Sequence, residues 1–494
     1  MNNVLDLVDE TIFRVERAAG VTNLIQCVWA YNRPVDINGL CRFHDQLRQG
    51  RLSRRIERSP LPFGRHRWVS PSDQPELEIV ATPRPREEFD AWLDEQANTP
   101  LDAEHGPGWH LAVLPFTDGG VGVSLVASHC LTDGVGLCEA VADAASGYEN
   151  AISWPAAGTR SRWQAVREDA RQTVRDIPAI GRAVAAAARF VQRNGGGTGS
   201  ATRPPAPPAG TGERITLPTA TIFVDAAEWD ARADALGGTS NTLLAAFAAR
   251  LAQGAGRVAT DGSVTLTMPI NERTAGDTRA NAITNVDITV DPTPATTDLR
   301  EIRAATKQAL IRSKKEPDER WTLTPLVPLV PERLGKRWVS AATNSAASVG
   351  ASNVGVVNPA VNRPAGTDAD YFAMKSLSSG MTSAMMHQLG GLLMLLSGRA
   401  YGRVFVSVVA YQPGRPSANV DLQQRVSSAL SDFSLTAVPG WGCTEPVARP
   451  DDHRRCPLRT MRKTVRIGAF ADYRSQARHG RERRRKFGLT EPPN

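Results

Sequence analysis

Two apolar runs of strand length, residues 109–116 and 121–128, are separated only by the four residues Thr-Asp-Gly-Gly. So short a connection, made of turn-forming residues, predicts an antiparallel β-hairpin. The apolar run 23–31 predicts a further strand, and residues 87–99 and 137–148 predict helices. In the second helix, apolar residues recur at i, i+4, i+7 and i+11, which places one apolar stripe on a sheet. The sequence therefore predicts a mixed α/β layer structure.

The length of 494 residues and a change of character after residue 159 predict two large domains joined by a linker. Residues 160–193 are basic and favour a helix, which Pro178 is expected to interrupt. The predicted organisation is a first half (1–159), a helical and Gly/Pro-rich crossover linker (160–213), a second half (214–440) and a basic, disordered tail (441–494). Within the second half we expect a helix at 240–253, strands at 263–270 and 284–291, and two strands within 390–414.

The formal net charge of +7 is unevenly distributed. Residues 441–494 hold 14 Lys/Arg against 6 Asp/Glu, which leaves a net charge of −1 for residues 1–440. A nucleic-acid partner is therefore not expected for the folded body. The basic tail is either simply solvated or makes an electrostatic contact, and together with the amphipathic segment 160–193 it suggests an anionic membrane surface as a partner.

The six cysteines form no CxxC pair and have no metal-ligand spacing with histidine, so we expect reduced thiols and no metal site. The first twenty residues carry acids where a signal peptide would be apolar, and no apolar run is long enough to span a bilayer. We therefore expect a cytoplasmic protein that is peripheral at the inner face of the plasma membrane.

His129 directly follows the apolar run 121–128 and precedes Asp133-Gly134 by four residues. A side chain at the end of a buried strand faces a crevice more often than a core, so His129 is a candidate general base. A buried structural histidine would have the same position in the sequence. Asp133 can fix the turn by pairing with a cation, and Gly134 can allow a tight bend or a positive φ where the helix begins.

His129 to Gly134 resembles the H-x-x-x-D-G motif of the CoA-dependent acyltransferase superfamily, which includes chloramphenicol acetyltransferase and peptide-synthetase condensation domains. Residues 1–435 are most similar to the bacterial wax ester synthase/diacylglycerol acyltransferase branch. The resemblance lies in residues 99–116, 237–248, 268–273, 279–286 and 351–360. Ser128 stands where that branch has a first histidine, and Thr242 follows Asn241 where the branch has aspartate.

The resemblance implies two chloramphenicol-acetyltransferase-like α/β domains that form a pseudo-dimer around a central tunnel. It implies that His129 deprotonates an acceptor, with Asp133 and Gly134 completing the catalytic motif. Asp133 then has a structural role, in a buried salt bridge to Arg273. The resemblance further implies that acyl-CoA is a substrate and that the enzyme holds no bound cofactor.

Substrate contacts are expected from Ser128, Trp109, Asn271, Asn281 and Asn353. An ordinary structural role is the alternative, because a tryptophan of this kind often belongs to the core and loop asparagines often form turns.

The leading functional hypothesis is an O-acyltransferase of lipid or glycolipid metabolism that moves an acyl group from an acyl thioester to an alcohol acceptor. One alternative is condensation chemistry, with an amide or ester formed from a carrier-bound substrate. The other is a non-catalytic relative that binds acyl groups or a protein, which the altered positions Ser128 and Thr242 would allow. Retention of His129, Asp133, Gly134 and Arg273 favours an enzyme.

Overall fold

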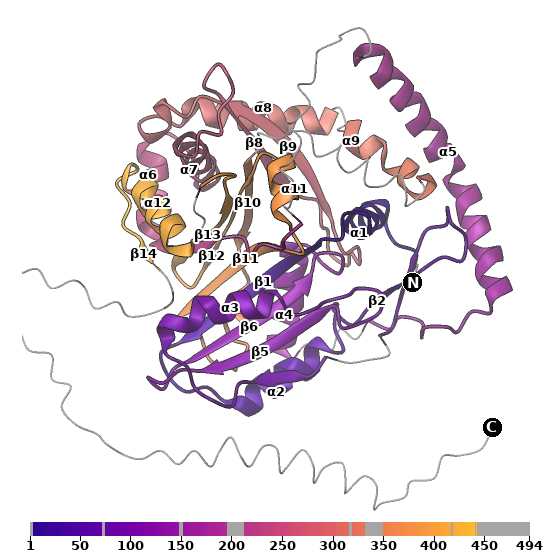
Figure 1. Cartoon of the computed structure of the whole chain (residues 1–494), viewed down its shortest axis with the longest axis horizontal. Helices are drawn as coiled ribbons and strands as arrows, with labels where there is room; N and C mark the ends of the chain where they lie inside the picture. The colour runs from indigo at the N-terminus through magenta and orange to yellow at the C-terminus, as the bar shows by residue number, and fades with distance from the viewer. Residues whose placement is uncertain are drawn as a thin grey trace, which may run out of the picture.

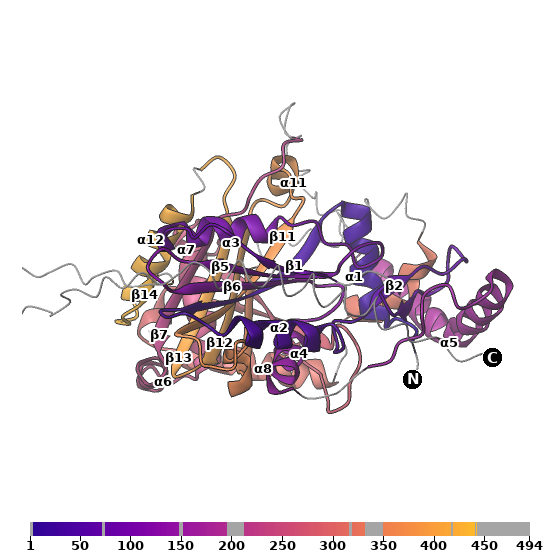
Figure 2. The same cartoon turned by 90° about the horizontal axis from the view of Figure 1, so that it is seen from below.

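The computed structural model describes residues 3–71, 75–147, 152–194, 212–315, 319–330, 349–415, 418–439 and 441. The described strands form two large sheets and a two-stranded ribbon, and helices pack against both large sheets (Figures 1 and 2). The predicted mixed α/β fold is confirmed. The described helices of ten residues or more are α1 (Leu7–Ala19), α2 (Ile37–Leu47), α4 (Gly134–Ser146), α5 (Arg162–Asn194), α6 (Ala226–Ala235), α7 (Ser240–Gly254), α8 (Arg300–Lys315) and α12 (Asn419–Ser431). The shorter ones are α3 (Phe89–Ala97), α9 (Glu319–Thr322) and α11 (Ser383–Gln388).

The first sheet has the strand order β11-β1-β6-β5-β4. Its strands are β1 (Thr22–Tyr31), β4 (Leu77–Ile79), β5 (Trp109–Pro115), β6 (Val121–Ser128) and β11 (Tyr371–Ser379). β5 and β6 pair antiparallel, so the predicted hairpin is present. Every residue of β6 is buried, because α3 covers one face of the sheet while α2 and α4 cover the other (Figure 2).

The second sheet has the order β14-β7-β13-β12-β10-β8-β9. Its strands are β7 (Thr219–Asp225), β8 (Val264–Asn271), β9 (Ile283–Val290), β10 (Val349–Val356), β12 (Leu392–Ala400), β13 (Arg403–Tyr411) and β14 (Val438–Pro439). The predicted strands within 390–414 form the β12–β13 hairpin. The ribbon joins β2 (Arg55–Glu57) to β3 (Arg67–Val69). The Ala-rich helix α7 is almost wholly buried beside this sheet, since its small side chains allow close packing.

The second half contributes one strand to the first sheet. β11 lies in the range predicted for the second half, but it pairs along its whole length with β1 of the first sheet. In the middle of β11, Lys375 is buried, and its ammonium lies 3.4 Å from a carboxylate oxygen of Asp90 and 5.8 Å from the ring centroid of Trp441. The first sheet is therefore complete only when the second half is folded.

The helix α5 continues through Pro178, so the predicted interruption there is wrong. Proline removes one backbone hydrogen bond, but Pro178 and Val174, whose carbonyl loses that bond, are both exposed, and water can replace the lost partner. No helix among the described residues is long and apolar enough to cross a membrane. Most of the predicted Gly/Pro-rich linker, and the predicted tail apart from Trp441, lie outside the described residues.

Candidate active site

His129 follows the last residue of β6 and is held by backbone contacts on both sides. Its amide donates to the carbonyl oxygen of Asn23 on β1 at 2.8 Å. Its own carbonyl accepts from the side-chain amide of Asn281, in the second half, at 3.0 Å. The position of the histidine is therefore set by both halves of the chain.

The His129 imidazole is suited to accept a proton. Burial lowers its pKa below the usual range, because a buried site disfavours the imidazolium, and the nearby charge of Asp133 only partly opposes this effect. Nδ1 is enclosed and has no hydrogen-bond partner among the described residues, so Nε2 is the nitrogen available to a substrate. At neutral pH the ring is uncharged and can act as a base.

Asp133 connects the motif to the second half. One carboxylate oxygen, Oδ1, accepts from the amide of Gly136 at 2.6 Å and caps α4. The other, Oδ2, accepts from Arg273 Nη2 at 2.7 Å and from the Ala282 amide at 2.8 Å. The amide of Asp133 donates to the carbonyl of Ala280 at 3.0 Å. Both carboxylate oxygens of Asp133 and its amide are thus bonded within the protein.

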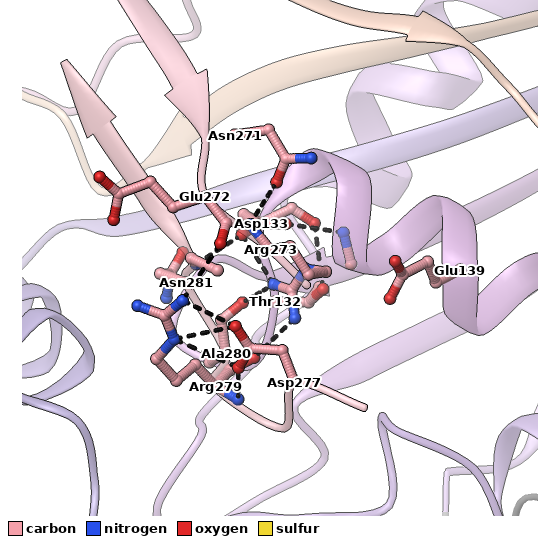
Figure 3. A network of polar contacts seen from close by, with 12 residues as sticks. Thr132, Asp133, Glu139, Asn271, Glu272, Arg273, Asp277, Arg279, Ala280 and Asn281 are labelled. Carbon is pink, nitrogen blue, oxygen red and sulfur yellow. Dashed lines mark hydrogen bonds and ion pairs between the residues drawn. The ribbon is translucent and has the colours of Figure 1, made fainter. Parts of the chain in front are cut away.

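Arg273 lies in the connection between β8 and β9, and its side chain bonds to backbone carbonyls of the same connection (Figure 3). Its side chain is 1% exposed and also donates to the carbonyls of Arg279 and Ala280 at 3.0 and 2.9 Å. The predicted salt-bridge partners are therefore joined in a buried network. The network folds residues 271–282 of the second half over the strand-to-helix turn of the first half.

Gly134 begins α4 without a positive φ, so the second of the two predicted alternatives, a tight bend or a positive φ, is not found. Its lack of a side chain instead provides space, because a Cβ there would lie 3.0 Å from Val354 on β10. The sequence analysis missed Gly136, where a Cβ would lie 2.8 Å from Thr132 Oγ1 and 2.9 Å from Arg273 Nη2. Both glycines let the two halves approach each other at the motif.

The three predicted asparagines have different surroundings. Asn281 is fully buried and its amide nitrogen bonds to Asp9 and to the His129 carbonyl. Asn353 Nδ2 donates to Asn241 Oδ1 at 2.5 Å. Asn271 is exposed and its Oδ1 accepts from the Arg273 amide at 3.0 Å, as in a turn. In each of them the side chain bonds within the protein.

Trp109 and Ser128 lie apart from the His129 side chain. Trp109 is buried in the first core, with its ring 5.5 Å from that of His44. Ser128 is buried and lines a cavity of about 250 Å³ beside α1, which also includes Glu16 and Cys130. Ser128 and Cys130 line this cavity, whereas His129 does not.

A buried carboxyl group in this cavity was missed by the sequence analysis. Glu16 accepts from the Cys130 thiol at 3.2 Å and from the Asn23 amide at 3.1 Å. Burial raises the pKa of Glu16 to about 7, and the hydrogen bond from Cys130 opposes this shift. The helical position of Glu16 gave no signal, because one acid in an amphipathic helix is usually exposed.

Asp9 and Arg54 gave no signal in the sequence either, although they bind the backbone of residues 278–281 in the second half. Asp9 accepts from the amides of Ala280 and Asn281 at 3.0 and 2.8 Å, and burial raises its pKa to about 6 against the opposing charge of Arg54. Arg54 donates to the carbonyls of Thr278 and Leu131 at 2.7 and 2.5 Å. Only tertiary contacts distinguish these two residues from ordinary surface charges.

A second cavity, of about 360 Å³, lies where α7 begins. It is lined by Thr239, Asn241 and Thr242 from this helix start and by Arg303, Thr306, Lys307, Leu310, Ile311 and Lys314 from α8. Lys307 and Lys314 have no ion-pair partner within the described part of the chain. A helix N-terminus beside three cationic side chains is favourable for an anion.

The described residues contain one group whose geometry suits a metal ion, formed by Asp102, Glu104 and His105. Arg17 forms ion pairs with both Asp102 and Glu104, and Arg58 pairs with Glu104 at 2.6 Å. These guanidinium groups already supply the positive charge that an ion would bring.

Solved structures with a similar fold cover nearly the whole chain. A wax ester synthase/diacylglycerol acyltransferase from Marinobacter aquaeolei VT8 aligns with a TM-score of 0.51 at 15% identity, over 87% of this chain and 98% of that one. The trichothecene 15-O-acetyltransferase from Fusarium sporotrichioides gives 0.55 at 12% identity, over 87% and 94%. The first condensation domain of the calcium-dependent antibiotic synthetase gives 0.53 at 15%, over 88% and 96%.

The chain has the same fold as these acyltransferases and this condensation domain. No protein-family model and no curated protein sequence matches it. At identities of 12–15%, the solved structures establish the fold and leave the reaction to be inferred from the site itself.

The buried Asp133–Arg273 pair generates a first prediction. Replacing Arg273 by alanine leaves the Asp133 carboxylate buried without its cation, so we expect the free energy of unfolding to fall by about 3–5 kcal/mol. Urea denaturation followed by circular dichroism measures the change. The matched control is Arg300→Ala, because Arg300 pairs with Asp298 at the same 2.7 Å but is 80% exposed, and we expect no measurable loss. Equal losses in both variants would contradict the importance of burial.

Glu16 generates a second prediction, on pH dependence. Its pKa rises from 4.5 to about 7 in the folded protein, so the fold loses stability as the pH rises from 4.5 to about 7, and the loss is complete above that pH. We expect Glu16→Gln to be more stable relative to wild type at pH 8.5 than at pH 5, by roughly 1–3 kcal/mol. Urea denaturation at both pH values tests this, with the exposed residue Glu301 replaced by glutamine as the control. A pH-independent difference between variant and wild type would refute it.

Proposed function

We propose that the protein is an acyltransferase that moves an acyl group from an acyl-CoA to a hydroxyl acceptor, with His129 as general base. The observation that carries the proposal is an imidazole with a lowered pKa, fixed at a strand end by backbone bonds to both halves. The shared fold with acyltransferases supports it. Rigid placement matters because proton transfer requires the base within hydrogen-bond reach of the reacting hydroxyl.

In this reaction Nε2 of His129 takes the proton of the acceptor hydroxyl while the oxygen attacks the thioester carbonyl. The tetrahedral intermediate then collapses, the carbon–sulfur bond breaks, and the CoA thiolate takes the proton from the imidazolium. General-base catalysis of this kind contributes about 10²–10⁴-fold to the rate. Asp133 holds the turn that carries the base and takes no proton, because its oxygens are bonded to Arg273 and to backbone amides.

Asn281 and Asn353 have a positioning role in this proposal. Both N–H groups of the Asn281 amide donate to protein acceptors, so they are not free to stabilise an oxyanion, whereas the Asn353 amide donates one N–H to Asn241. Asn281 instead orients the His129 carbonyl and with it the end of β6.

The basic cavity beside α7 supports an anionic acyl donor. The helix start and the side chains of Arg303, Lys307 and Lys314 match the phosphate groups of CoA. The cavity is connected to the motif through β10, because Asn241 in the cavity wall accepts from Asn353, and the next residue, Val354, faces Gly134.

Condensation on a carrier-bound substrate is the second candidate function. The similarity to a condensation domain described in complex with a substrate analogue favours it. A carrier-bound thioester has a single phosphate at the pantetheine arm, whereas CoA has three phosphate groups to place in the basic cavity.

The base role generates a third prediction. Purified wild-type protein should release free CoA thiol from a panel of acyl-CoAs when alcohols or sugars are added, and His129→Ala should lower that rate by about 10²–10⁴-fold. His387→Ala is the matched control, because it replaces a histidine on α11 that lies outside the motif, and we expect it to keep the wild-type rate. Equal release by wild type and His129→Ala would contradict the base role. No release by folded wild type would favour the carrier-bound donor.

The donor cavity generates a fourth prediction. We expect Lys307→Ala and Lys314→Ala to raise the KM for acyl-CoA several-fold with little change in kcat, because the phosphates bind equally in the ground and transition states. The KM for the matching acyl-N-acetylcysteamine, which has no phosphate, should not change. Arg312→Ala on the same helix serves as control, since Arg312 does not line the cavity. An equal effect on both thioesters would argue against phosphate binding.

A further inference from the structure

The helix α5 runs along the edge of the molecule, and only one of its faces packs on the body (Figure 1). Ala165, Asp169 and Ala183 on that face are buried. The rest of the helix is mostly exposed, which raises the question of what its outer face contacts.

Each acidic residue of α5 has an arginine partner. Asp169 accepts from Arg67 at 2.9 Å and Arg160 at 3.1 Å. Asp176 lies 3.3 Å from Arg65, and Glu168 lies 3.5 Å from Arg160, just before the helix. Asp169 and Asp176 are therefore neutralised on the inner side of the helix, and the 36% exposed Glu168 is neutralised at its start.

The outer face of α5 has an exposed apolar stripe. It consists of Trp163, Val174, Ile177 and Val184, each more than half exposed, with Trp163 at 84%. At about 100° of rotation per residue, these four side chains fall within an arc of about 80°. A contiguous apolar stripe of this kind indicates a contact that the described part of the chain does not provide.

A row of arginines lies directly beside the apolar stripe. It consists of Arg167, Arg171, Arg175, Arg182 and Arg189, all exposed. By the same rotation they occupy the adjacent arc, of about 80°, on one side of the stripe. The outer face of α5 thus combines apolar side chains with positive charge and contains no acid.

We propose that α5 is an interfacial helix that binds the surface of an anionic lipid membrane. The apolar stripe would enter the boundary between headgroups and acyl chains, and the arginines would bind lipid phosphates. Nucleic acid fits less well, because the stripe would then stay in water. Pairing with a second copy fits less well, because the like-charged arginine rows would be brought together. This inference goes beyond the proposed acyl transfer and does not depend on it.

Vesicle flotation with the full chain tests the proposal. We expect binding to phosphatidylcholine vesicles that contain 30% phosphatidylglycerol, weak binding without phosphatidylglycerol, and only partial loss in 0.5 M salt, because apolar insertion is insensitive to salt. Trp163→Ala/Ile177→Ser and Arg171→Glu/Arg175→Glu should each weaken binding at least tenfold. Val420→Ser is the matched control, since Val420 is 77% exposed on α12, away from the stripe, and we expect binding as in wild type.

Three results would overturn the proposal. One is no binding of the wild type, and another is wild-type binding by both α5 variants, which would assign the membrane contact to other residues such as the basic tail. The third is a change of oligomeric state in the α5 variants, measured by light scattering, which would make the stripe an interface between copies. Thiol release from acyl-CoA with a water-soluble acceptor should be unchanged in the α5 variants, so failure here is distinguishable from failure of the proposed acyl transfer.

Discussion

The ion pair between Asp133 and Arg273 is the contact on which the arrangement of the candidate site depends. It joins a helix start in the first half to the β8–β9 connection in the second, and both partners are almost fully buried. Charges buried in this way are favourable only when further hydrogen bonds accompany the ion pair. The backbone of residues 279–282 supplies such bonds to both Nη atoms of Arg273 and to Oδ2 of Asp133, while Arg273 Nε has no partner among the described residues. The same segment carries Asn281 to the His129 carbonyl. One ionic contact therefore closes the two halves and orients the base.

Other contacts also hold the two halves together. Asp9 and Arg54 bind the segment 278–281 from the first half, and β11 from the second half completes the first sheet. The consequence is that neither half presents the site alone. A group held from several directions keeps one geometry, and the neutral imidazole of His129 is available without rearrangement. One of the two cavities lies beside Ser128, the residue before His129, and the other lies beside Asn241 in the second half.

Local sequence patterns predicted much of the fold. The β5–β6 hairpin followed from its four-residue connection, and the helix α4 followed from its apolar spacing. The exchange of β11 could not be predicted, because strand pairing between distant segments leaves no local pattern. The continuity of α5 at Pro178 was missed for a different reason. Proline breaks helices mainly where no water can bond the freed carbonyl, and exposure at Val174 is a property of the folded surface.

For the candidate site, the sequence by itself determined the motif from His129 to Gly134 and its place between a buried strand and a helix, and the family resemblance predicted Arg273 as the partner of Asp133. Only the tertiary structure decided what these residues contact. It gave Gly134 a spacing role, committed Asn281 to backbone support, and placed Glu16 in a buried cavity. The physical reason is that burial and charge pairing depend on segments more than a hundred residues apart in sequence. Spacing along the chain reflects local geometry, whereas the pKa of a side chain depends on every group that packs around it.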